Sequence, residues 1–184
     1  MSRLPRVLFR SGERRALAFE APAWWKVALA LLVALLLQTT VEPYMTLRGA
    51  APSLVLLLIL WYGLRTNSAA GLMFGALAGA CEDALTGWTG AAWTISSAIV
   101  GALAGRSAGT RPTESRLWLV PYVALATLAR YGIYALVLRA EDRVIPLPAT
   151  HFHAILWQAL LNALFAYLVM MLIRQAGVSR VGFR

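Results

Sequence analysis

The sequence predicts an all-α, polytopic integral membrane protein with about six transmembrane helices. Of its 184 residues, 60% are hydrophobic and only 14% are charged, and the mean hydropathy is +0.67. Soluble domains are about 45–50% apolar and about 25% charged, so this composition indicates a chain embedded in lipid. Its hydrophobic runs approach the roughly 20 residues that a helix needs to cross a bilayer. The single cysteine, Cys81, excludes a disulfide within the chain.

Short connections rich in proline, glycine and basic residues separate the predicted spans. Trp24 and Trp25 place the start of the first span at the membrane interface. Pro52 opens the second span, at a position where helices tolerate proline. The six predicted spans are 24–41, 53–64, 67–85, the run that ends at Gly105, 117–138 and 151–173.

Basic residues predict the orientation of these spans. Cytoplasmic loops are enriched in Lys and Arg, and most of the 17 basic residues fall on one side when both termini are cytoplasmic. The predicted parts are therefore a basic cytoplasmic segment (1–23), a membrane domain (24–173) and a basic cytoplasmic tail (174–184). The net charge of +9 is interpreted as this topology signal, so lipid rather than nucleic acid is the expected partner.

The third predicted span carries a ridge of small residues with a four-residue step. Such a step advances about 400° along a helix, so the positions form a slanted line. Small residues let helix backbones approach closely inside a bilayer, and this ridge predicts contact with another helix. That helix lies either within the bundle, our first expectation, or on a partner protein. The ridge consists of Gly71, Gly75, Gly79, Asp83 and Gly87.

Acidic residues near the end of this ridge have two interpretations. Glu82 and Asp83 form either a solvated acidic cap or the anchor of a buried polar contact. Arg130 is the one ionisable residue well inside a predicted span. Helical side chains lean toward the N-terminus of their helix. For Glu82, Asp83 and Arg130 this direction points from the outer membrane face toward the middle of the membrane. A pair between Arg130 and one of the two acids is therefore predicted.

Two amide side chains lie one helical turn apart in the sixth predicted span. Gln158 and Asn162 are unfavourable against lipid, so we expect them to face the bundle interior and hydrogen-bond another helix, with a ligand pocket as the alternative. Their candidate partners in the fourth span are Thr94, Ser96 and Ser97.

No pattern in the chain indicates catalysis. The sequence has no H-E-x-x-H, G-x-S-x-G, Walker or Rossmann motif. His151 and His153 are two residues apart, a spacing that places them on different sides of a helix and argues against a metal pair. We expect a protein that is not an enzyme and that has no cofactor.

The order of these parts resembles the family of the bacterial rod shape-determining protein MreD. The residues that carry the resemblance are the proline-led run 52–62, the G-x-x-x-G-x-x-x-D-x-x-x-G pattern at Gly75, Gly79, Asp83 and Gly87, then Asn162 and the basic end at Arg174. The resemblance implies a non-enzymatic inner-membrane subunit of the cell-elongation (Rod) complex. Such a subunit supports cell shape and peptidoglycan synthesis by binding MreC, with MreB, RodA and penicillin-binding protein 2 as further partners. Arg130 and Glu82 receive no role from this resemblance.

The same resemblance supplies an alternative function. The family is similar in fold to the substrate-binding S components of energy-coupling-factor vitamin transporters. An S component would need a deep pocket with converging polar groups, capped by long outer loops. The outer loops predicted here are short, so we favour the scaffold function, with the glycine ridge as a candidate protein–protein surface.

Overall fold

The computed structural model describes residues 23–41, 44, 46–87, 89–108, 116–142 and 149–181. Within these ranges the regular secondary structure is helical, apart from one isolated β-bridge between Leu47 and Ala50, and turns connect the helices. The all-α fold class is therefore confirmed for this part of the chain. Its elements are α1 (Trp24–Val41), α2 (Leu54–Gly63), α3 (Ser68–Thr86), α4 (Ala92–Arg106), the 3₁₀ turn η2 (Arg116–Trp118), α5 (Leu119–Ala140) and α6 (Ala149–Val181).

Two of the helices are long and apolar enough to cross a membrane by themselves. They are α5 and the part of α6 from His153 to Leu172. The apolar helices α1 and α2 are shorter; the ten residues of α2 rise only about 15 Å, against roughly 30 Å of bilayer core. The prediction of six transmembrane spans therefore stays a prediction. Helix α6 also continues past the predicted boundary at residue 173, as far as Val181.

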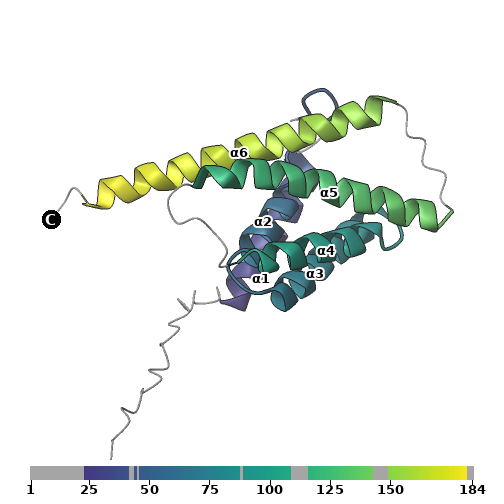
Figure 1. Ribbon diagram of the computed structural model, residues 1–184, viewed down its shortest axis with the longest axis horizontal. Helices are drawn as coiled ribbons and strands as arrows, with labels where there is room; N and C mark the ends of the chain where they lie inside the picture. The colour runs from purple at the N-terminus through teal and green to yellow at the C-terminus, as the bar shows by residue number, and fades with distance from the viewer. Residues whose placement is uncertain are drawn as a thin grey trace, which may run out of the picture.

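The helices form two antiparallel pairs that meet where α4 packs against α5, and α2 contacts both pairs. Figure 1 shows α3 beside α4, and α5 beside α6. Helix α2 contacts α1, α3, α4 and α5, whereas α6 packs mainly against α5. The sequence of α2, LVLLLILWYG, has an apolar residue at nearly every position, as expected of a helix that is covered on all sides.

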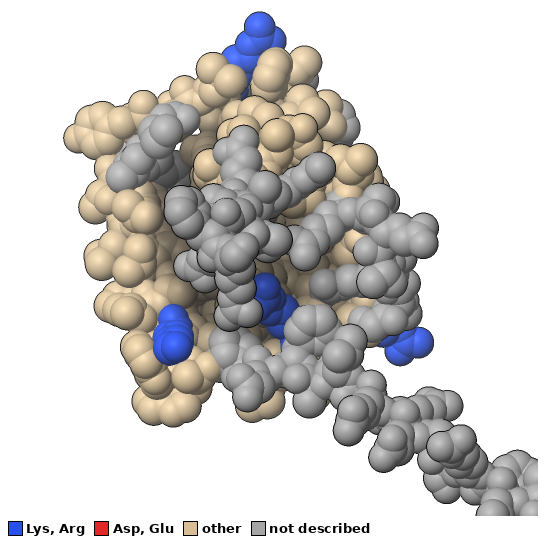
Figure 2. Space-filling view, turned by 90° about the vertical axis from the view of Figure 1, so that its left-hand side faces the viewer, with Lys and Arg blue, Asp and Glu red and all other residues tan. Residues whose placement is uncertain are grey.

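The interior of the bundle consists of two apolar clusters that share α2. Val55 and Ile59 of α2 pack with residues of α1 and α3 in one cluster. Leu56 and Leu60 pack with residues of α4 and α5 in the other. All four side chains are fully or almost fully buried. On the face shown in Figure 2, the described surface is mostly uncharged, with a few separate basic side chains, as expected of a surface that meets lipid.

Local sequence signals set several helix ends. Ser53 caps α2 by accepting a hydrogen bond from the backbone N–H of Leu56, and Asn67 caps α3 by accepting one from Ala70. Gly87 ends α3 with a φ of 72°, a left-handed conformation that glycine adopts without steric cost. The end of α3 at Gly87 places the acidic residues of its last turns, Glu82 and Asp83, near the start of α4.

Candidate functional site

The predicted glycine ridge lies against α4. A Cβ atom on Gly71, Gly75 or Gly79 would collide with a backbone carbonyl oxygen of that helix. The oxygens concerned belong to Gly101, Ser97 and Trp93, respectively. The three glycines therefore allow the backbones of α3 and α4 to touch along three successive turns, within the chain itself.

Helix α4 contributes small residues of its own to this interface. A Cβ atom on Gly101 would collide with the carbonyl oxygen of Gly71, and one on Gly105 with that of Asn67. Ser97, Gly101 and Gly105 repeat the four-residue step of the α3 ridge. This second ridge was not predicted, although its four-residue spacing is the same signal that predicted the first.

Gly87 departs from the predicted ridge. It is the last position in the four-residue series, but nothing lies within 4 Å of the place where its Cβ would be. The chain has left the helical path here, because Gly87 is the left-handed residue that follows α3. Its assignment to helix packing is therefore wrong, and its role is to end the helix.

Asp83 caps the N-terminus of the neighbouring helix. Its carboxylate accepts hydrogen bonds from the backbone N–H groups of Trp93 (3.1 Å) and Thr94 (2.8 Å). The hydroxyls of Thr94 (2.7 Å) and Thr89 (2.6 Å) donate to the same carboxylate. Ala91, at the N-cap position of α4, makes no side-chain capping bond. Asp83 of α3 therefore supplies the acceptor and the negative charge that the start of α4 lacks.

Glu82 turns into the bundle and forms an ion pair with Arg130 of α5. The structure thus brings Arg130 to Glu82 rather than to Asp83. Both are buried: Arg130 is 2% exposed and Glu82 is 7% exposed. The side-chain amide of Gln38, on α1, lies beside the Glu82 carboxylate, and its oxygen accepts a hydrogen bond from the backbone N–H of Val55 (3.4 Å). A charge removed from water in this way is tolerated only when it is paired and hydrogen-bonded.

The guanidinium of Arg130 reaches two further helices. Its Nε donates to the hydroxyl of Ser97 on α4 (3.0 Å), and its Nη1 donates to the hydroxyl of Ser53 at the start of α2 (3.4 Å). Its Cζ lies 4.5 Å from the centre of the Trp93 ring, within the range of a cation–π contact.

Asn162 joins α6 to the same group. Its Oδ1 accepts a hydrogen bond from the backbone N–H of Ser53 (2.7 Å), and its Nδ2 donates to the hydroxyl of Thr127 (3.1 Å). Each of the six helices, or the residue that caps it, contributes to one set of neighbouring polar groups, all of them buried except the half-buried Gln38. We call this set the polar centre: Gln38, Ser53, Glu82, Ser97, Thr127, Arg130 and Asn162.

The predicted partners of the two amides are wrong. Among the described residues, Asn162 bonds Ser53 and Thr127, and Gln158 accepts a hydrogen bond from the hydroxyl of Tyr131 (2.6 Å). Helix α6 packs mainly against α5, so the hydroxyls of α4 serve other groups. Thr94 donates to Asp83, Ser96 to the carbonyl of Trp93, and Ser97 accepts from Arg130.

Three members of the polar centre were absent from the sequence analysis: Gln38, Ser53 and Thr127. Ser53 had a usable signal, because a serine directly before an apolar run is typical of an N-cap. Thr127 lies three residues before Arg130 and therefore on the same face of α5. Gln38 is a polar residue near the end of an otherwise apolar span, which itself suggests an inward-facing contact.

The chemistry of this site is that of a structural connection. The charged groups are engaged with each other and with amides and hydroxyls, and no cluster of three or more His, Cys, Asp or Glu residues in the described ranges could hold a metal ion. The arrangement joins helices that are far apart in sequence, such as α2 and α6 through Ser53 and Asn162.

Comparison with known protein families matches residues 21–176 to the family described as rod shape-determining protein MreD. Neither a curated protein nor a solved structure matches the chain. The matched range covers most of the sequence and contains both the glycine ridge and the polar centre. The resemblance predicted from the order of the sequence motifs is confirmed.

Proposed function

Because the chain belongs to the family of the rod shape-determining protein MreD, we propose that it acts as a non-enzymatic inner-membrane subunit of the Rod complex. In this role it binds MreC and supports cell shape and peptidoglycan synthesis, with MreB, RodA and penicillin-binding protein 2 as associated proteins. The family match carries the proposal, since it identifies a shape-determining membrane protein over most of the chain. The proposed placement is multi-pass, with both termini in the cytoplasm.

The use of the buried polar groups supports a scaffold. Arg130 and Glu82 would be the natural residues for proton transfer or substrate binding in such a chain, yet each is bonded to side chains of other helices. A scaffold needs a bundle of defined shape, and buried polar contacts that require one arrangement of helices are a means of specifying it. The binding partner would then meet the outer surface of the bundle.

The vitamin-transport alternative has no comparable support. The family match does not point to it. A vitamin site requires polar groups that converge on an open pocket, whereas those of the polar centre converge on one another.

Co-purification tests the proposed function. The tagged full-length chain is extracted from bacterial membranes in a mild detergent, and the proteins that remain bound are identified by mass spectrometry. We expect MreC to be recovered with the wild-type chain and with the control variant Leu77→Ala, which alters an exposed side chain of α3. Recovery of an ATPase module in place of MreC would contradict the scaffold and favour a transporter.

A cell-based experiment asks whether binding matters for shape. In rod-shaped bacteria that lack their own protein of this family, expression of the chain should restore rod shape. The same chain with Gly79→Leu should fail to do so, because the α3–α4 contact has no room for a side chain. If a chain that does not bind MreC still restored rod shape, its support of cell shape would not depend on binding MreC, and that part of the proposal would be wrong.

A further inference from the structure

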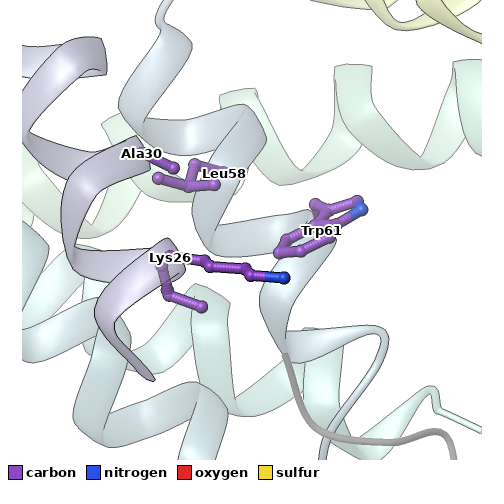
Figure 3. Close-up of a pocket in the computed structure, with 5 residues that line it drawn as sticks. Lys26, Ala30, Leu58 and Trp61 are labelled. Atoms are coloured by element: carbon purple, nitrogen blue, oxygen red, sulfur yellow. The ribbon is translucent and has the colours of Figure 1, made fainter. Parts of the chain in front are cut away.

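A shallow groove lies between α1 and α2, at the end of the bundle where α1 begins. It has a volume of about 280 Å³ and is lined by Lys26, Val27, Ala30, Leu58 and Trp61. Figure 3 shows the Lys26 side chain extending from α1 toward the Trp61 ring on α2. The groove is therefore apolar along its length, with a cation at its edge.

A second cation lies beside Trp61, one of the residues that line the groove. The guanidinium carbon of Arg65 lies 4.9 Å from the centre of the Trp61 ring, while the Lys26 ammonium lies 5.5 Å from the ring of Trp25. Within the described ranges, neither cation forms an ion pair with an acidic side chain. A cation–π contact does not engage the N–H groups in hydrogen bonds. The N–H groups of Lys26 and Arg65 can therefore still donate hydrogen bonds to an anion.

The two cations lie at one membrane face. Lys26 is in the first turn of α1, and Arg65 follows the end of α2. Lys26 lines the groove together with Trp61, and Arg65 lies over the Trp61 ring, so the start of α1 and the end of α2 are at the same end of the bundle. Trp24 and Trp25, which are 81% and 53% exposed, mark the same level as a membrane interface.

From this combination we propose that the groove binds one anionic phospholipid. Lys26 and Arg65 hold the phosphate of the head group, and an acyl chain lies along Val27, Ala30, Leu58 and Trp61. Basic pockets between membrane helices are known to suit anionic head groups. This site is independent of the proposed binding of MreC.

Native mass spectrometry of the delipidated full-length protein tests the site. The protein is titrated with dioleoylphosphatidylglycerol, and dioleoylphosphatidylcholine serves as the zwitterionic comparison. We expect tighter binding of phosphatidylglycerol. Each of Lys26→Gln and Arg65→Gln should weaken that binding by about fivefold, and the double variant by about 25-fold, since a basic residue near a membrane surface contributes about 1 kcal/mol.

Arg48→Gln is the matched control. Arg48 also lies over a tryptophan ring, 4.7 Å from the centre of Trp157, but it is not at the groove. Its substitution should leave phosphatidylglycerol binding unchanged. Circular dichroism and size-exclusion profiles that match the wild type would show that every variant is folded.

The acyl-chain part of the proposal has its own test. Ala30→Phe fills the groove and keeps both cations, so it should weaken lipid binding, while sn-glycerol 3-phosphate alone should bind far more weakly than the lipid. Equal binding of glycerophosphate would mean a phosphate site without a lipid chain, and would overturn the proposal. Equal affinity for the two phospholipids, or equal losses in Arg48→Gln and Arg65→Gln, would also overturn it.

Discussion

The α3–α4 interface and the polar centre join helices in different ways. At the interface, glycines remove side chains so that two backbones touch, and the attraction consists of many weak contacts between atoms. In the polar centre, side-chain hydrogen bonds and one ion pair join α2, α3, α4, α5 and α6. The first connection links neighbours in sequence, whereas the second links residues as far apart as Ser53 and Asn162. The contact between α3 and α4 depends on the four-residue spacing of small residues along each helix. The arrangement of the whole bundle depends on the polar centre.

The largest effect is expected from breaking the buried ion pair. Arg130→Met leaves the Glu82 carboxylate buried without its partner, which should cost about 3–5 kcal/mol of the free energy of unfolding. The double variant Arg130→Met/Glu82→Gln removes both charges and should lose less than the single variant. Denaturant unfolding in detergent measures both losses.

Arg48→Met provides the matched control for that measurement, because Arg48 is exposed and also contacts a tryptophan ring. It should change the free energy of unfolding by less than about 0.5 kcal/mol. If the losses of the two single variants at Arg130 and Glu82 simply add in the double variant, the two side chains do not form a pair in the folded protein.

The next largest effect concerns the glycine ridge. The Cβ atom of an alanine at position 79 would already collide with the Trp93 carbonyl, so even Gly79→Ala should destabilise the protein, by about 1–3 kcal/mol. Gly79→Leu should cost more. Alanine is usually tolerated at close contacts between helices. At position 79 it should not be, because the atoms that its Cβ would meet belong to the backbone of α4 and cannot move aside as a flexible side chain could.

Gly132→Ala is the control for the ridge. Gly132 lies inside α5 with nothing within 4 Å of its Cβ position. Alanine there should leave the protein as stable or raise its melting temperature slightly, since glycine costs about 1 kcal/mol in a helix interior. Equal melting temperatures for Gly79→Ala and Gly132→Ala would show that α3 and α4 are not in backbone contact.

The smallest effect is expected at the cap that Asp83 provides for α4. Asp83→Ala removes an acceptor for two backbone N–H groups and two hydroxyls, and loss of a cap typically costs about 0.5–2 kcal/mol. Asp83→Asn keeps one acceptor oxygen and should lose less. The comparison requires melting curves in the same detergent, and identical curves for Asp83→Ala and the wild type would argue against a capping role.

Much of the helical layout could be predicted from sequence, because the signals are local. The apolar run 24–41 is the range of α1, and Asn67 and Gly87 bracket α3 as cap residues. The residues of the α3 ridge up to Asp83 follow from a four-residue spacing that any helix converts into one slanted line. Likewise, an arginine inside an apolar span predicts a buried partner, whatever the fold.

The tertiary structure alone decided which residues meet. The two acids are adjacent in sequence, but consecutive helical residues point about 100° apart; Glu82 therefore faces Arg130 while Asp83 faces the start of α4. The partners of Asn162 depend on α6 packing against α5 rather than α4, which no local pattern specifies. The central position of α2, the shortest of the described α-helices, is likewise determined by packing among helices and not by a local pattern. Spacing along one helix determines which residues share a face, whereas packing among helices determines what that face contacts.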